Sequence, residues 1–320
     1  MFTSLRSRSM HAAIIDTWGS APKYIKSPSQ RPPTPPPTQL KSVYEPQPCI
    51  SSSARAAGKH YSATTLPHEP GVDGAGTLDD GTPVYVSTLS SGQGSFKELV
   101  NVPKRAVTPL PQGLDPVTAA ATVNPALSSW MAMKTRVDLS ILPKTFTVVI
   151  MGATSISGSI AISLVRTLGA GKVIGVGRDK AKLAQLPLDE IVALADGAAG
   201  QTGFEDLGDV DIILDYLYGQ PTLQLLAAIK TTRPLQYVQL GSMAGPEVNM
   251  PAAILRSKDI TLRGAGPGAW RTDQMDGEIA PLLQALVGAK GARFAVRKSS
   301  EVEEVWDAYG SSERLVFLIE

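Results

Sequence analysis

The chain of 320 residues is long enough for about two domains, because one domain typically takes roughly 100–200 residues. Its 43% hydrophobic residues, 18% charged residues and formal net charge of +1 are typical of a globular protein. This balance argues against a nucleic-acid binder, which would carry a basic excess. No apolar run approaches the roughly 20 residues of a membrane-spanning helix, so we expect no membrane association. The single cysteine, Cys49, excludes an internal disulfide and a multi-thiolate zinc site, and the three scattered histidines indicate no metal site.

The N-terminal run MFTSLRSRS contains two arginines and several serines but no acidic residue, which resembles the start of a mitochondrial presequence. We favour a plain extension over residues 1–9 and a cytoplasmic protein. From Met10 onward, HAAIIDTW predicts a strand.

Proline is concentrated in one part of the chain, with eight of the 25 prolines between Lys26 and Pro48. Proline cannot donate a backbone hydrogen bond, so this composition predicts an irregular segment over residues 26–54. We favour a surface linker. The alternative is a ligand for a proline-recognising partner domain.

After this segment, short β-prone runs separated by Gly, Pro and Asp predict an irregular β domain from Leu66 to Val100. Asp115 is a candidate N-cap, with Pro116 at the first position of an alanine-rich helix. Apolar strands then alternate with helices, beginning with TFTVVIMG. This alternation predicts a doubly wound parallel sheet over residues 116–269. The terminal runs ARFAVRKS and RLVFLIE either extend that sheet or return to the β domain.

A phosphate-binding turn is predicted where TFTVVIM runs into a helix, because such a turn needs small residues and free N–H groups at the helix start. The turn comprises Gly152, Ala153, Thr154, Ser155, Ile156, Ser157 and Gly158. Ser155 stands where a third glycine would complete the fingerprint. Close packing alone would also explain small residues here, but their position between a strand and a helix favours nucleotide binding.

The end of the next strand carries a cation where an NAD site would place a carboxylate. Gly177 leaves room, and Arg178 would form charge-assisted hydrogen bonds with a 2′-phosphate, assisted by Lys182. NADPH is therefore the predicted cofactor. The alternatives are a solvated Arg/Lys pair, and a role for Asp179 in contacting the ribose.

Two later strands also end in small residues, and ligands of doubly wound folds lie outside the carboxyl ends of strands. These positions suit a flat nicotinamide ring against the backbone, although each also suits a tight turn. They are Gly241, Ser242 and Ala244 after one strand, and Gly264, Gly266 and Gly268 after the other.

Taken in order, these motifs resemble the medium-chain dehydrogenase/reductase superfamily, specifically its zinc-free quinone oxidoreductase-like branch. The matching runs are RAAGKHY at 55–61, LPHEPGVDGAG at 66–76, GSFKELVNVP at 94–103, GATSISG at 152–158, GVGRDKAKL at 175–183, VQLGSMAG at 238–245 and LRGAGPG at 262–268.

The resemblance implies a GroES-like β domain over residues 10–115, rejoined by 270–320, and a Rossmann NADP-binding domain over 116–269. It also implies hydride transfer from NADPH to a quinone or an activated C=C or C=O group. Tyr61 is the candidate hydrogen-bond donor to the developing oxyanion and Arg55 a candidate electrostatic group. Asn124 and Ser128 match cofactor-side positions of the family. Packing for Tyr61, a surface location for Arg55, and a proton relay through His60 are open alternatives.

One departure from the family lies in TQLKSVYEPQPCISSSA, where a strand of the active-site wall is expected and no strand alternation is seen. A non-catalytic NADPH-binding protein with a damaged cleft is therefore the main rival, and a trans-acting enoyl reductase of a biosynthetic pathway is the other. The family also suggests a homodimer through the nucleotide domains. Substrate identity is beyond what the sequence predicts.

Overall fold

The structure is a computed structural model that describes residues 10–27, 38–44, 65–89, 94–195, 202–289, 293–306 and 314–319, with the backbone alone for 38–44. It divides into two compact units. Unit 1 comprises Met1–Asn124, Ile279–Gly288 and Arg293–Glu320, and unit 2 comprises Pro125–Glu278 and Ala289–Ala292. The divisions fall inside helices α2 (Pro116–Thr135) and α7 (Thr272–Leu286). We predicted a substrate domain over residues 10–115 with 270–320 and an NADP-binding domain over 116–269. These boundaries and roles stay a prediction.

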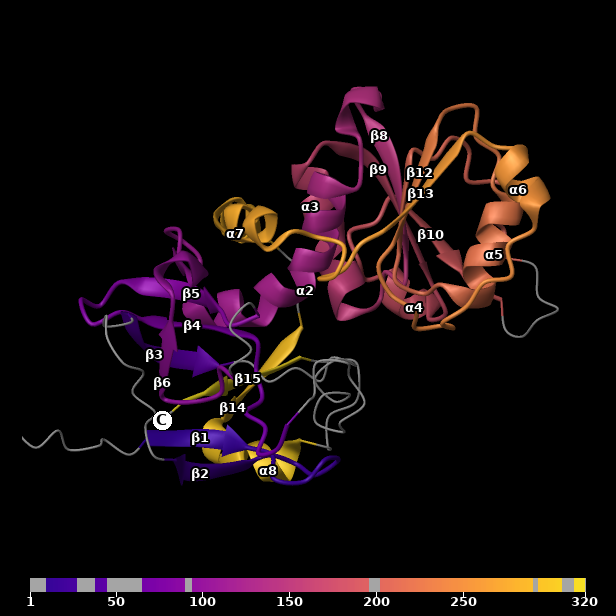
Figure 1. The fold of residues 1–320 in the computed structure, drawn as a ribbon. Coiled ribbons are helices and arrows are strands. Elements are labelled where there is room, and N and C mark those ends of the chain that lie inside the picture. The colour runs from indigo at the N-terminus through magenta and orange to yellow at the C-terminus, as the bar shows by residue number, and fades with distance from the viewer. Residues whose placement is uncertain are drawn as a thin grey trace, which may run out of the picture. The chain divides into compact units, whose positions relative to one another are not determined.

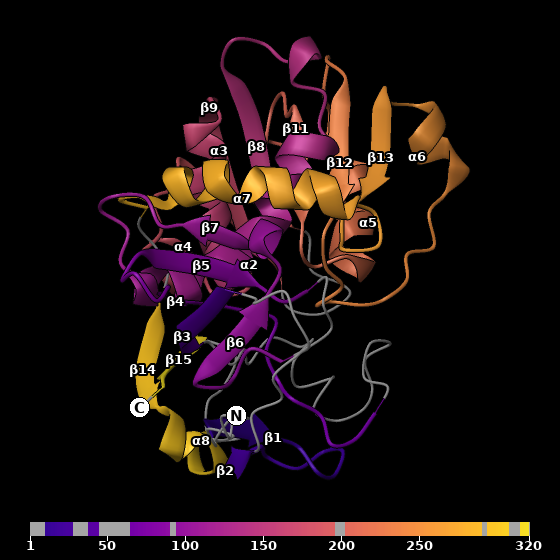
Figure 2. The same ribbon diagram turned by 60° about the vertical axis from the view of Figure 1, so that its left-hand side comes forward.

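Unit 2 is built on a six-stranded sheet with the order β10-β9-β8-β11-β12-β13, in which every neighbouring pair is parallel. Figure 2 shows β8, β11, β12 and β13 side by side. The strands are β8 (Phe146–Met151), β9 (Ala170–Gly177), β10 (Glu190–Ala193), β11 (Ile212–Asp215), β12 (Leu235–Gln239) and β13 (Ile260–Gly264). The predicted doubly wound sheet is confirmed.

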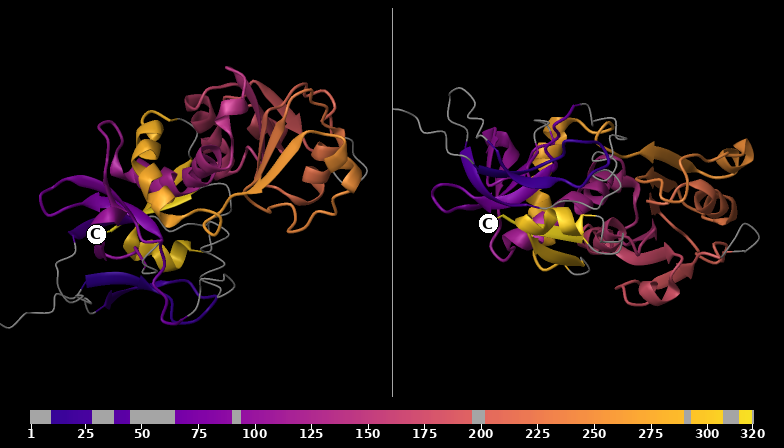
Figure 3. Two further views of the ribbon diagram at one scale, coloured as in Figure 1. Left: turned by 45° about the horizontal axis from the view of Figure 1, so that its top comes forward. Right: turned by 90° about the horizontal axis from the view of Figure 1, so that it is seen from below.

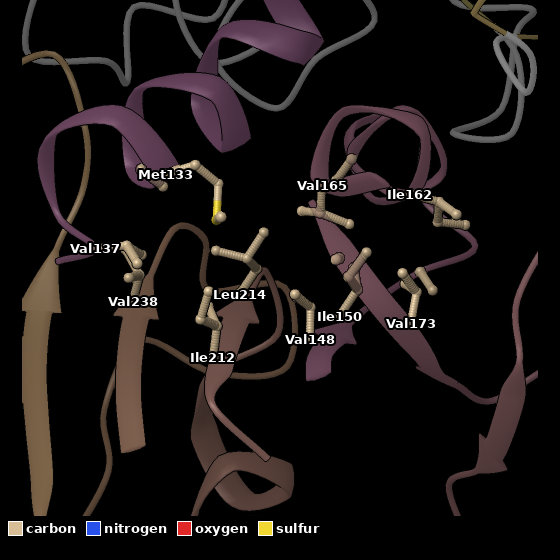
Figure 4. Packing of buried hydrophobic residues seen from close by; sticks show 14 of the residues in the cluster. Met133, Val137, Val148, Ile150, Ile162, Val165, Val173, Ile212, Leu214 and Val238 are labelled. Carbon is tan, nitrogen blue, oxygen red and sulfur yellow. The ribbon is translucent and has the colours of Figure 1, made fainter. Parts of the chain in front are cut away.

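Helices cover both faces of this sheet, as the apolar sequences of its strands require. One face packs against α2 and α3 (Ile156–Thr167), in a cluster that includes Met133, Val148, Ile162 and Leu214 (Figure 4). The other face packs against α5 (Gly219–Ala228) and α6 (Ala252–Arg256), and Figure 1 shows α3 and α5 on opposite sides of the strands. The short helix α4 (Lys180–Leu183) follows β9, and a 3-10 helix spans Leu139–Ile141.

Helix α2 begins as its sequence predicts. Pro116 is its first residue, and the Asp115 carboxylate accepts the Thr118 N–H at 3.0 Å. Proline has no backbone N–H, but an N–H at the first position of a helix has no helical carbonyl to bond. Pro116 therefore loses no hydrogen bond of the helix.

Unit 1 contains a seven-stranded sheet with the order β14-β15-β3-β4-β5-β7, and β6 pairs with β3. Its strands are β3 (Thr38–Tyr44), β4 (Asp73–Thr77), β5 (Pro83–Ser87), β6 (Leu99–Val102), β7 (Val107–Pro109), β14 (Phe294–Lys298) and β15 (Arg314–Leu318). The C-terminal runs therefore return to the β domain, where β15 pairs with β3. The remaining elements are the hairpin β1 (Met10–Ile14) and β2 (Lys23–Ser27), helix α8 (Val302–Val305), and 3-10 helices at Lys104–Ala106 and Ser299–Glu301. Figure 3 shows the indigo hairpin beside the yellow α8 in the same unit.

The prediction of an irregular segment over residues 26–54 is wrong for Thr38–Tyr44, which form β3. This strand pairs antiparallel with β4, β6 and β15. The strand is stabilised by backbone pairing with residues far away in the sequence. Local composition does not show such pairing, and the neighbouring prolines made the segment look irregular. Residues 28–37 and 45–54 lie outside the described residues.

Candidate functional site at the carboxyl edge of the parallel sheet

The predicted phosphate-binding turn has the geometry that its residue types imply. Gly152 follows β8 with φ of +85°, a conformation that favours glycine. A Cβ on Gly158 would lie 2.3 Å from the Gly152 carbonyl oxygen, so only glycine fits there. Ser155 is the N-cap of α3, and its Oγ accepts the Gly158 N–H at 3.0 Å. This cap explains why serine stands in place of a third glycine.

The start of α3 is accessible to a ligand. Ala153 is buried, whereas Thr154, Ser155, Ile156 and Ser157 are partly exposed. The first N–H groups of a helix have no helical acceptor, so together with the macrodipole they favour a bound anion.

The predicted 2′-phosphate residues lie at the end of β9. Gly177 is the last residue of that strand and is buried, whereas Arg178 is exposed. Arg178 has no hydrogen bond or ion pair with another described residue. Lys182 Nζ lies 3.7 Å from Asp179 Oδ2, and the other Asp179 oxygen caps α4 by accepting the Lys182 N–H at 3.0 Å. Asp179 is thus engaged locally, whereas Arg178 is available to a phosphate.

The small residues after β12 and β13 differ from one another. A Cβ on Gly241 would lie 2.8 Å from the Tyr216 carbonyl oxygen, so its size is required by packing, while Ser242 and Ala244 are exposed. By contrast, no heavy atom would lie within 4 Å of a Cβ on Gly264, Gly266 or Gly268. Open space therefore borders the backbone after β13.

The helix positions Asn124 and Ser128 stand out in α2. From Ala119 to Met133 they are the two residues that are not buried, and their spacing of four places them on one face of the helix. Ser128 Oγ lies 3.3 Å from the Tyr216 hydroxyl, a contact that sequence reasoning missed. Tyr216 directly follows β11, at the same sheet edge as Gly152.

Tyr216 is almost completely enclosed, with 5% of its surface exposed. Burial raises the pKa of its phenol to about 12, so the hydroxyl keeps its proton at neutral pH.

A buried carboxylate organises the turn after β11. Asp215 accepts the N–H groups of Leu217 and Tyr218 at 2.7 and 3.0 Å, and the Tyr237 hydroxyl at 2.7 Å. It also accepts the Thr222 hydroxyl. These bonds support Tyr218 at φ of +55°, which is unusual for a bulky residue.

A cavity of about 400 Å³ lies on the α5 side of β12 and β13. Its lining includes Gly264 from the predicted cofactor residues, and otherwise Tyr218, Thr222, Leu226, Tyr237, Gln239, Pro246, Met250, Leu262 and Arg263.

The predicted catalytic residues Arg55 and Tyr61, together with Cys49 and His60, lie outside the described residues. Within the described ranges, no three His, Cys, Asp or Glu side chains are grouped so that they could hold a metal ion. In those ranges no helix is both long and apolar enough to cross a membrane.

Comparison with curated proteins finds a relative along almost the whole chain. The chain is 34% identical over 346 aligned residues to the "Probable NADPH-dependent quinone reductase tdiC" of Emericella nidulans, covering 93% of this chain and 96% of the relative. The chain belongs to the medium-chain dehydrogenase/reductase superfamily. The predicted membership in its quinone oxidoreductase-like branch is confirmed.

Other comparisons support the superfamily's fold. A second curated relative, the acrylyl-CoA reductase AcuI of Ruegeria pomeroyi, is 29% identical over 140 residues, 40% of this chain and 42% of the relative. Among solved structures, the YhdH oxidoreductase of Salmonella enterica in complex with NADP has a TM-score of 0.73 at 17% identity, covering 97% of this chain and all of that one. A Mycobacterium abscessus oxidoreductase gives 0.76 at 19% identity, covering 98% and 99%. No family model matches the chain. The predicted GroES-like plus Rossmann architecture is confirmed.

Proposed function

We propose that this medium-chain dehydrogenase/reductase reduces a quinone or an activated C=C or C=O substrate with NADPH, without zinc. The chain is an NADP-dependent oxidoreductase. The observation that carries the proposal is the match to the NADPH-dependent quinone reductase over 96% of that relative. Within unit 2, the exposed Arg178 at the end of β9 supports the choice of NADP over NAD.

The residues of unit 2 fit this cofactor. The partly exposed start of α3 suits the pyrophosphate, and Arg178, assisted by Lys182, suits the 2′-phosphate. The open backbone at Gly264, Gly266 and Gly268 leaves room for a flat ring. When bound, NADPH supplies the hydride.

The chain's own task is to hold the reactants and to stabilise charge. Reduction of an enone or quinone places negative charge on a carbonyl oxygen, which a hydrogen-bond donor must stabilise. Tyr61 is the proposed donor and Arg55 the proposed electrostatic group, on the sequence resemblance alone. Zinc independence rests on the single cysteine of the chain, since thiolate ligands are what the zinc-binding members use.

The experiment mixes the purified full chain with NADPH and a panel of quinones, enones and acrylyl-CoA, with and without a chelator. Consumption of NADPH that depends on a quinone or enone and survives chelation supports the proposal. Reduction of acrylyl-CoA alone would favour the enoyl reductase alternative, to which the partial match with the acrylyl-CoA reductase points. Saturable NADPH binding without turnover on any substrate would favour the non-catalytic alternative.

A homodimer through the nucleotide units remains part of the proposal. Strand β13 is the last strand at its edge of the sheet, and Thr261, Leu262 and Arg263 are exposed. An exposed edge strand offers unpaired backbone groups to a second copy. Light scattering after size-exclusion chromatography would measure the mass, and a monomer at micromolar concentration would contradict this element.

A further inference from the structure

Tyr216 lies where the strand order of the parallel sheet reverses. Strand β8 has β9 on one side and β11 on the other, so a crevice opens between the carboxyl ends of β8 and β11. Gly152 directly follows β8 and Tyr216 directly follows β11, and the Tyr216 N–H donates to the Met151 carbonyl at 3.1 Å. Tyr216 therefore borders the point at which such sheets bind their ligands.

The backbone around Tyr216 leaves it little freedom. A Cβ on Gly152 would lie 3.4 Å from the Tyr216 Cβ, and the Tyr216 carbonyl accepts the Met243 N–H at 3.2 Å. The ring belongs to the apolar cluster between the sheet and helices α2 and α3. The Tyr216 backbone is thus bonded to the end of β8 and to the chain that follows β12, and its ring is packed in the apolar cluster.

The Ser128 hydroxyl lies within hydrogen-bonding distance of two partners, the Pro125 carbonyl and the Tyr216 hydroxyl. The Ser128 hydroxyl donates its single proton to the Pro125 carbonyl at 3.0 Å. In that arrangement the Tyr216 hydroxyl donates to Ser128 Oγ across the 3.3 Å contact, in which either oxygen can be the donor. Ser128 Oγ keeps one free lone pair, on the partly exposed face of α2.

The order of the strands indicates which end of a dinucleotide this group meets. Arg178, the proposed 2′-phosphate residue, follows β9, and the turn proposed for the pyrophosphate follows β8. The next strand in the sheet is β11, so the nicotinamide end of a bound cofactor would lie beside Tyr216 and Ser128.

We infer that Tyr216 is a positioning residue for the nicotinamide end of the cofactor site, where it holds Ser128 Oγ ready to accept an N–H donor such as the carboxamide. This inference rests on the proposed use of NADPH.

The test is a double-mutant cycle on the full chain, with the NADPH dissociation constant measured by fluorescence titration and the melting temperature of each ligand-free variant as a second readout. Y216F removes the hydroxyl and keeps the ring, and should raise the dissociation constant about fivefold, the effect of one neutral hydrogen bond. S128A should raise it at least as much. Because Tyr216 acts through Ser128, the double variant should bind NADPH like S128A alone.

Tyr85→Phe is the matched control, since it removes another buried tyrosine hydroxyl, one that donates to Asp73 at 2.8 Å in unit 1. It should lower the melting temperature and leave NADPH affinity within about twofold of wild type, as it removes no cofactor contact. An NADPH affinity of Y216F equal to that of wild type would overturn the inference. A double variant whose dissociation constant rises by the product of the two single effects would also overturn it, because the two residues would then act independently. If Y216F does not fold, S128A removes the same bond from the other end, and its unchanged affinity is equally decisive. A wild-type chain that does not bind NADPH contradicts the proposed function instead.

Discussion

Gly158 lies against the carbonyl of Gly152 so closely that a Cβ on Gly158 would be 2.3 Å from that oxygen. The contact joins the first turn of α3 to the end of β8, and it brings the helix start to the sheet edge where an anion would bind. Whatever replaces glycine at residue 158 must displace backbone on one side or the other.

Gly158→Ala should therefore separate α3 from β8. We expect a loss of stability of about 1–3 kcal/mol from overpacking, and at least tenfold weaker NADPH binding because the turn changes shape. Gly277→Ala in α7 is the control, since no heavy atom would lie within 4 Å of its Cβ, and alanine there should stabilise the helix by up to about 1 kcal/mol. Denaturant unfolding and NADPH titration measure both effects. Equal behaviour of the two variants would refute the packing argument.

Arg178→Ala should weaken NADPH binding far more than NADH binding. Arg178 is exposed and has no ion pair with another described residue, so its removal costs the fold little. Loss of charge-assisted hydrogen bonds to the 2′-phosphate should cost about 1.5–3 kcal/mol, or roughly 10- to 150-fold in affinity. Arg256→Ala, at another exposed arginine, is the control. Equal losses for both cofactors would show that Arg178 does not bind the 2′-phosphate.

Asp73 should make unit 1 less stable as the pH rises. The carboxyl is completely buried, which raises its pKa to about 7, although the Tyr85 hydroxyl donates to it at 2.8 Å. Between its ordinary pKa and about 7 the unfolded chain releases this proton and the folded chain keeps it. Folding stability therefore falls with pH across that window, by up to about 1.4 kcal/mol per pH unit, and is flat with respect to this group above it.

Asp73→Asn keeps a hydrogen-bond acceptor for Tyr85 and removes the titrating group. From about pH 4 to about pH 7, roughly the ordinary and the raised pKa of Asp73, the stability of this variant should therefore fall less than that of wild type. Asp80→Asn is the contrast. Hydrogen bonds from Thr82 lower the Asp80 pKa in an exposed turn, so losing that carboxylate should not flatten the slope. Unfolding followed by circular dichroism measures these profiles. If stability varied with pH in the same way for wild type and Asp73→Asn, a raised pKa of Asp73 would be contradicted.

Asp215→Asn should be more destabilising than Thr222→Val. The carboxylate accepts four hydrogen bonds, and an asparagine would turn an N–H donor toward at least one of those donors. We expect a loss of about 2–4 kcal/mol for Asp215→Asn and about 1 kcal/mol for Thr222→Val. Thermal unfolding of both variants measures the order, and the reverse order would contradict the network.

The sequence predicted those elements whose signal is local. TFTVVIM followed by small residues predicted β8, the turn and α3, and Asp115 with Pro116 predicted the start of α2. Strand β3 was missed because its stability comes from pairing with β4, β6 and β15, while its flanks are rich in proline. Tyr216 was missed because DIILDYLY reads as an ordinary apolar strand. Only the strand order, which places the end of β11 beside that of β8, gives this tyrosine a position at the site.

Hydride transfer from NADPH is most directly tested by a single turnover of the full chain with an enone and NADPH deuterated at the nicotinamide C4. We predict that deuterium appears on the β-carbon of the reduced product, and that NADPH is consumed in equal amount. Retention of the label in an unchanged cofactor, under conditions where NADPH is bound, would contradict the proposed reaction.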